Sequence, residues 1–140
     1  MSRLALALAA LLAAPALAAE PADVASTYRL VTEAAPAAVR VGGRGKLVVA
    51  VEPLTKGVHV DPKAPFKVKV SPSAGLSVAK ADLRRADSVD PQAESPRFEI
   101  PFGATAAGAQ EAKLQLEFYV CSDAWCVKQS RTAAVAVKVQ

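Results

Sequence analysis

The chain has 140 residues, of which 52% are hydrophobic and 21% charged, with a formal net charge of +4. This is the length of one domain, and the positive excess contains no Lys/Arg run longer than Arg84-Arg85, which we interpret as a solvated pair. The chain is therefore not expected to bind nucleic acid. One His, two Cys and one Met exclude His-rich zinc sites, Met-rich copper sites and four-cysteine clusters. No cofactor or metal is expected.

Residues 1–19 have the pattern of a secretory signal peptide. Arg3 gives a positive start, Leu and Ala fill 4–14, and Ala16-Leu17-Ala18 supplies the small residues that a signal peptidase reads. The apolar run is shorter than the ~20 residues that a bilayer requires, so a membrane span is not expected. No Cys lies at the cleavage region, which also excludes a bacterial lipid anchor. The mature chain is predicted to be periplasmic or secreted, where disulfides persist.

The composition of the chain after the signal peptide changes near residue 37 and indicates a tail followed by a folded domain. Residues 20–36 are rich in Ala and Pro and predict a flexible tail, in which 28–32 could add an edge strand. Residues 37–140 are predicted to form the folded domain. Apolar and polar residues alternate there with the period of two that marks half-buried strands.

Short strands with this alternation recur along the domain and are separated by turns. They are predicted at 46–51, 66–70, 76–78, 98–102, 113–120 and 132–139. The polar stretch 86–96 predicts a mobile loop, and Pro101 suggests that its strand lies at a sheet edge. Strands of this number and length predict an all-β fold, an immunoglobulin-like antiparallel β-sandwich.

The two cysteines, Cys121 and Cys126, lie where a hairpin would turn between the last two long strands. If Val120 and Val135 face the core, both cysteines fall on the outer face, provided that no bulge intervenes. They would then lie opposite each other, close enough to form a disulfide that solvent reaches. A ring of about six residues stabilises the fold by only ~2 kcal/mol, so a redox role and a structural role are equally supported by the geometry.

Residues near this pair offer several modulators. Asp123 would disfavour a thiolate, whereas Lys128, on the same face as Cys126, would favour one. Trp125 would either shield the sulfurs or pack the hairpin. His59 and the thiols would make at most three metal ligands, with Asp123 a strained fourth, so a metal site is not predicted.

The segment Cys121-Ser-Asp-Ala-Trp-Cys126, followed by a Val-rich strand, resembles the N-terminal periplasmic domain of the thiol:disulfide interchange protein DsbD family. Lys56-Gly57-Val58-His59-Val60 is similar to the Gly-x-His segment of these domains, and Ala107-Gly108 also fits. The resemblance extends over 41–139. The spacing between the cysteines is one residue shorter than is usual in the family, and Val127-Lys128-Gln129 replaces its Tyr-Pro-Pro.

The resemblance implies that Cys121 and Cys126 relay electrons by thiol-disulfide exchange, with Asp123 as the acid within the loop. It implies thioredoxin-like exported proteins as partners, and a free-standing domain would need a separate membrane electron donor. The alternative is a non-catalytic immunoglobulin-like interaction domain in which the same bond staples the hairpin. For exchange, we expect Cys126 to form the mixed disulfide and Cys121 to resolve it, because of their respective neighbours Lys128 and Asp123.

Overall fold

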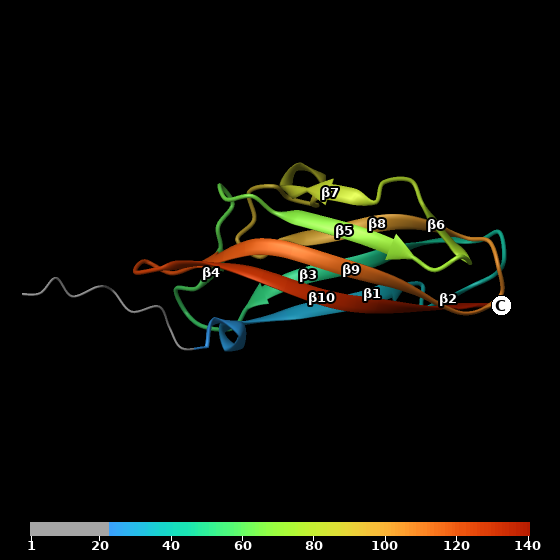
Figure 1. Cartoon of the computed structure of the whole chain (residues 1–140), viewed down its shortest axis with the longest axis horizontal. Helices are drawn as coiled ribbons and strands as arrows, with labels where there is room; N and C mark the ends of the chain where they lie inside the picture. The colour runs from blue at the N-terminus through green and yellow to red at the C-terminus, as the bar shows by residue number, and fades with distance from the viewer. Residues whose placement is uncertain (1–22) are drawn as a thin grey trace, which may run out of the picture.

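The computed structural model describes residues 23–140. They form two facing sheets (Figure 1). The first sheet has the order β1-β3-β8-β6 and the second β2-β10-β9-β5-β7, with β4 beside β9. The strands are β1 (Tyr28–Ala35), β2 (Ala38–Val39), β3 (Arg44–Pro53), β4 (His59–Val60), β5 (Lys67–Pro72), β6 (Leu76–Val78), β7 (Asp82–Arg84), β8 (Arg97–Ala104), β9 (Gly108–Cys121) and β10 (Cys126–Val139). Two 3-10 turns, η1 (Val24–Thr27) and η2 (Arg85–Asp87), complete the elements.

This arrangement confirms the predicted immunoglobulin-like β-sandwich. All strand pairs are antiparallel except one, in which β2 runs parallel to the end of β10 and pairs at Lys138 and Val139. The chain thus leaves the first sheet after β1 and joins the second at β2. No β-strand crosses the polar stretch 86–96, as expected of a loop, and its mobility stays a prediction.

The core lies between the sheets and follows the alternation seen in the sequence. On β5 and β9, the residues predicted to face inward are buried and the lysines between them are exposed. Phe66 stacks on Phe118 with ring centroids 5.2 Å apart, and Phe98 lies 5.0 Å from Phe66. Burial of such large rings is a dominant stabilising contribution in a domain of this size.

The boundary predicted at residue 37 is wrong. The structure places residues 24–36 in the domain rather than in a tail, because β1 pairs with β3 along its whole length, from Tyr28 opposite Pro53 to Ala35 opposite Lys46. The Tyr28 ring is buried and meets Phe118 edge-on at 5.3 Å. The edge strand suggested at 28–32 is therefore confirmed, and it is longer than predicted. The predicted signal peptide lies outside the described residues.

Pro101 does not lie on an edge strand, because β8 runs between β3 and β6. The Ala104 amide donates to the Gly43 carbonyl. Even-numbered residues of β8 therefore direct their backbone N–H and C=O groups toward β3, and odd-numbered residues direct theirs toward β6. β6 pairs only as far as Phe102. On this side of β8, no described strand lies opposite Pro101. The lack of an N–H group at Pro101 therefore removes no hydrogen bond between strands.

The strand β10 has a long open side. It pairs with β9 residue by residue along its full length, whereas β2 covers only its last two residues. The Lys138 amide donates to the Ala37 carbonyl, so even-numbered residues of β10 turn their backbone groups away from β9. Within the described part of the chain, no strand pairs with that side between residues 127 and 137.

Candidate disulfide site at the β9–β10 hairpin

The hairpin of β9 and β10 extends past the other strands at one end of the sandwich (Figure 1). The register from Cys126 opposite Cys121 to Val139 opposite Gly108 is continuous, so no bulge disturbs the alternation. The Ser122 amide donates to the Trp125 carbonyl at 2.8 Å and closes the turn. The two cysteines are consequently a non-hydrogen-bonded pair, the type in which opposite residues come closest.

Cys121 and Cys126 form a disulfide, with their Cα atoms 4.1 Å apart. The predicted pairing of the two residues across the hairpin is confirmed. Solvent reaches the pair on the side of Cys126, which is exposed, whereas Cys121 is only 2% exposed. An incoming group therefore approaches the bond from the side of Cys126.

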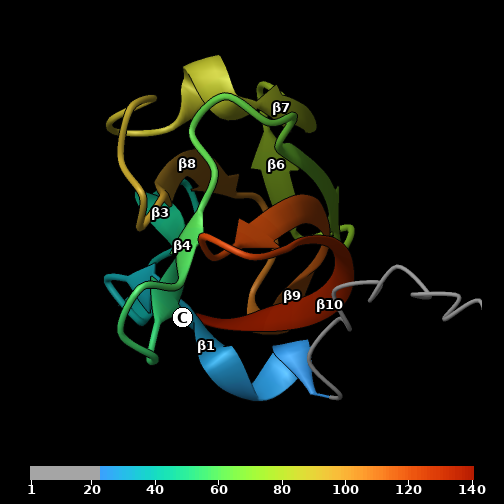
Figure 2. The same cartoon turned by 90° about the vertical axis from the view of Figure 1, so that its left-hand side faces the viewer.

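Cys121 is buried although it lies on the outward side of β9, and β4 is the cause. This two-residue strand lies along β9 on the side away from β10, with His59 opposite Cys121 and Val60 opposite Val120 (Figure 2). The side chains of directly opposite residues share a face, so His59 falls on the outer face with the cysteines. A strand this short gives no alternation in the sequence, and its position was not predicted.

Asp61 is the residue of the site that sequence reasoning missed. Its backbone amide donates to the Tyr119 carbonyl at 3.2 Å, which continues the pairing of β4 by one step. A carboxylate oxygen of Asp61 and the sulfurs of Cys121 and Cys126 all lie within 4.8 Å of one another. The only signal in the sequence was its spacing from His59. Asp61 lies two residues after His59, so in an extended segment both side chains point to the same face, and this segment also carries part of the family resemblance.

Arg85 fixes the backbone at Asp61, so its interpretation as part of a solvated pair is wrong. Its Nη2 donates to the Asp61 carbonyl at 2.7 Å and its Nη1 to the Ala93 carbonyl at 3.3 Å. The guanidinium also lies over the Phe66 ring, 5.4 Å from the centroid. Burial lowers the pKa of Arg85, and the charge of Asp61 acts in the opposite direction. Arg84, by contrast, is exposed.

The other predicted modulators are spread along the hairpin. Asp123 is exposed in the turn, and its modulating role stays a prediction. Lys128 is exposed on the face of Cys126, as expected, and its Nζ lies 3.8 Å from a Glu117 carboxylate oxygen. Trp125 is half-buried and packs against the hydrophobic core, which supports the packing interpretation of this residue.

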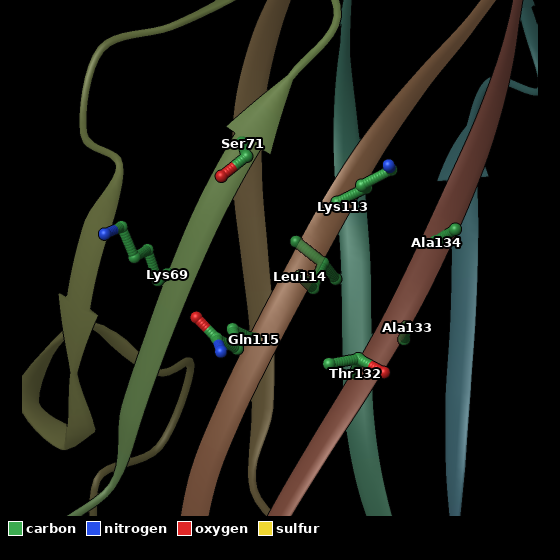
Figure 3. A pocket seen from close by; sticks show the side chains of 8 residues that line it. All are labelled: Lys69, Ser71, Lys113, Leu114, Gln115, Thr132, Ala133 and Ala134. Carbon is green, nitrogen blue, oxygen red and sulfur yellow. The ribbon is translucent and has the colours of Figure 1, made fainter.

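A pocket lies elsewhere, on the outer face of β5, β9 and β10 (Figure 3). It has a volume of about 490 Å³ and is lined by Lys69, Ser71, Lys113, Leu114, Gln115, Thr132, Ala133 and Ala134. None of these is a His, Cys or carboxylate, so the two lysines are its only titratable groups and it holds no group for redox chemistry. The disulfide is therefore the stronger candidate for a functional site.

The fold and the bond together define a disulfide-bonded immunoglobulin-like domain. No family model matches this chain, and no curated protein matches it in sequence. Among solved structures, it is similar to AggA, the major subunit of aggregative adherence fimbriae type I from Escherichia coli. The identity is 8%, the TM-score is 0.42, and the match covers 81% of this chain and 93% of that chain. A likeness at this level has no bearing on function.

Proposed function

We propose that this domain exchanges electrons with exported proteins through the Cys121–Cys126 disulfide. The observation that supports this most is the unequal exposure of the two cysteines. Cys126 is open to an incoming thiolate, whereas Cys121 is buried and held beside it. The resemblance of the hairpin segment to the DsbD family supports the same role.

The exchange follows from thiol chemistry. A partner thiolate attacks the Cys126 sulfur, the sulfur–sulfur bond breaks, and its electron pair leaves with Cys121, which takes up a proton. A second partner thiol then attacks the mixed disulfide and releases Cys126, so the partner is oxidised and this pair is reduced. The reverse sequence reduces an oxidised acceptor. In that direction Cys126 attacks and Cys121 resolves the mixed disulfide.

The location of Asp61 affects both directions of exchange. Its carboxylate disfavours negative charge on the nearby sulfurs, most of all on buried Cys121, where solvent screening is weak. Thiolate departure from Cys121 is therefore opposed, and resolution by Cys121 needs its proton removed. Asp61 is thus a second carboxylate near the bond, and the role that the resemblance implies for Asp123 stays a prediction.

The partners we propose are thioredoxin-like exported proteins, with a separate membrane electron donor, in the periplasm or outside the cell. A closed disulfide fits an oxidising compartment. No helix in residues 23–140 is long and apolar enough to cross a membrane.

The second candidate is a non-catalytic interaction domain with a stapled hairpin. A closed bond in an immunoglobulin-like domain fits this candidate without any added chemistry. The burial of Cys121 and the packing of Trp125 on the core also favour it, because both fix the hairpin in one conformation. The two candidates differ in how readily the bond is reduced.

The reduction potential of the pair decides between the candidates. Equilibration with thioredoxin of known potential, read by mass after thiol alkylation, is the measurement. We expect a value above about −300 mV, in the range of disulfides that cycle. A value below about −300 mV would establish the stapled interaction domain instead.

The order of attack is tested with single-cysteine variants. In Cys121→Ala and Cys126→Ala, the remaining thiol is first converted to its thionitrobenzoate disulfide. Each variant is then mixed with a thioredoxin whose resolving cysteine is replaced by Ser. We expect the covalent adduct to form at least about tenfold faster in Cys121→Ala, because only Cys126 is exposed. Faster reaction of Cys126→Ala would reverse the assigned roles.

A further inference from the structure

We propose that reduction of the Cys121–Cys126 disulfide opens a binding site for Zn²⁺. The four groups that would form it are the two thiolates, the Asp61 carboxylate and the His59 imidazole. They come from three neighbouring strands, with His59 on β4, Cys121 on β9 and Cys126 on β10, while Asp61 directly follows β4. The strand register and the short distances between these groups place all four on the outer face at the hairpin end of the sandwich.

The distances already allow three of these ligands to converge. The sulfurs of Cys121 and Cys126 and an oxygen of Asp61 lie within 4.8 Å of one another. Tetrahedral zinc with Zn–S bonds of about 2.3 Å separates two sulfur ligands by roughly 3.7 Å, so three ligands around one ion fit within such a spacing. His59 lies opposite Cys121 in an antiparallel pair, where Cα atoms are about 5.5 Å apart. A rotation of its side chain would supply the fourth ligand.

The chemistry of the donors selects the metal. Two thiolates, an imidazole and a carboxylate are the ligand types that Zn²⁺ accepts in four-coordinate sites, whereas Ca²⁺ and Mg²⁺ require oxygen ligands. The three anionic ligands exceed the charge of one Zn²⁺ by a single negative charge. Arg85, whose guanidinium binds the Asp61 carbonyl, provides a positive charge beside the site.

The site and the disulfide exclude each other, because each sulfur serves either the bond or the metal. A phosphine reductant takes an oxygen atom from water, becomes the phosphine oxide, and leaves two thiols. Zn²⁺ then displaces both thiol protons, so its affinity rises with pH. This inference goes beyond electron exchange, since it requires only that the bond be reducible and no protein partner.

The test uses residues 20–140, reduced with the phosphine and titrated with Zn²⁺ against a chromophoric chelator. We expect one Zn²⁺ per reduced chain and at least about a hundredfold weaker binding by the oxidised chain. Co²⁺ is the second probe, and we expect the visible absorption of tetrahedral thiolate-bound Co²⁺ only after reduction. Equal affinity of the two redox states, or absence of that absorption, would overturn the proposal.

Variants identify the ligands. Asp61→Asn is expected to weaken Zn²⁺ binding by about tenfold or more, and Cys126→Ser to weaken it further. Glu111→Gln, which removes an exposed carboxylate at the far end of the same hairpin, is the matched control and should leave the affinity unchanged. If Asp123→Asn weakened binding and Asp61→Asn did not, the assigned site would be wrong. Thermal melting of each oxidised variant checks its fold, and the reduction potential measured without zinc tests electron exchange separately.

Discussion

Arg85 joins three parts of the molecule that are distant in sequence. It binds the carbonyls of Asp61 and Ala93 and lies over the Phe66 ring, and its Nε is buried without a hydrogen-bond partner. Two charge-assisted hydrogen bonds and a cation–π contact offset the desolvation of the guanidinium. This residue therefore holds the segment after β4 in the place where Asp61 meets the disulfide.

Replacing Arg85 with Met is expected to lower the free energy of unfolding by about 1–3 kcal/mol, because two backbone carbonyls lose a charged donor. Urea denaturation measures this loss. Arg84→Met is the matched control, since the Arg84 side chain is exposed, and its effect should stay within about 0.5 kcal/mol. Equal losses in both variants would show that Arg85 does not anchor the segment.

Single residues of the site were predictable only where a regular strand carried them. The face to which Cys126 points could be predicted from Val135, because β10 has no bulge between these two residues. The burial of Cys121 and the approach of Asp61 depend on β4, which has two residues and no readable period. Tertiary placement of such a segment is decided by packing that no local pattern encodes.

At the scale of elements, the β9–β10 hairpin is held by its pairing and its core face more than by its covalent link. Fourteen residues of β10 pair with β9, and Phe118, three residues before the end of β9, is fully buried. The disulfide closes a ring of about six residues, whose loop entropy is small. The bond thus constrains the end of the hairpin and contributes little to the fold.

The double variant Cys121→Ser, Cys126→Ser is expected to stay folded and to lose about 2 kcal/mol of stability. Phe118→Ala should cost more, about 3–5 kcal/mol, because it removes a ring that contacts Phe66 and Tyr28. Chemical denaturation of both variants gives the comparison. An unfolded double serine variant would mean that the bond is required for folding and would contradict the argument from ring size.

Most long strands were predictable because one of their faces is buried and the other solvated. The predictions at 66–70, 113–120 and 132–139 fall within β5, β9 and β10 or differ by one residue. β2, β4 and β7 were missed, since two or three residues are too few to show a period. β6 is equally short and was predicted only because a turn at 71–75 precedes it. Pro101 led to the wrong prediction of an edge strand. A proline lacks the N–H group on only one side of its strand, and on that side of β8 the neighbouring strand β6 ends before it reaches Pro101.

At the scale of the whole molecule, β1 completes the first sheet and closes one side of the core. Tyr28 connects the two sheets, since its hydroxyl donates to Gln129 at 2.9 Å and accepts from Arg131 at 3.1 Å. The Ala-rich composition predicted a tail over 20–36, although a strand was suggested at 28–32. Burial does not alternate regularly along β1, which weakens its periodicity, although the backbone pairing is complete.

A chain that begins at Ala37, the boundary predicted from composition, is expected to lose its cooperative unfolding transition. It lacks the eight residues of β1 that pair with β3 and the buried Tyr28 ring. A chain that begins at Asp23 should melt at the same temperature as one that begins at Glu20. Calorimetry of the three chains measures this. A cooperative transition in the chain that begins at Ala37 would show that the folded domain begins at residue 37, as the composition predicts.

Because one side of β10 is unpaired, its amide protons are of two kinds, those bonded to β9 and those open to solvent. Lys128, Ser130, Thr132, Ala134 and Ala136 turn their N–H groups away from β9, as the contact between Lys138 and Ala37 indicates. The residues between them donate into the ladder with β9. Exchange with deuterated solvent is therefore expected to alternate along the strand, fast at even positions and slow at odd ones, until β2 begins to cover it at Lys138.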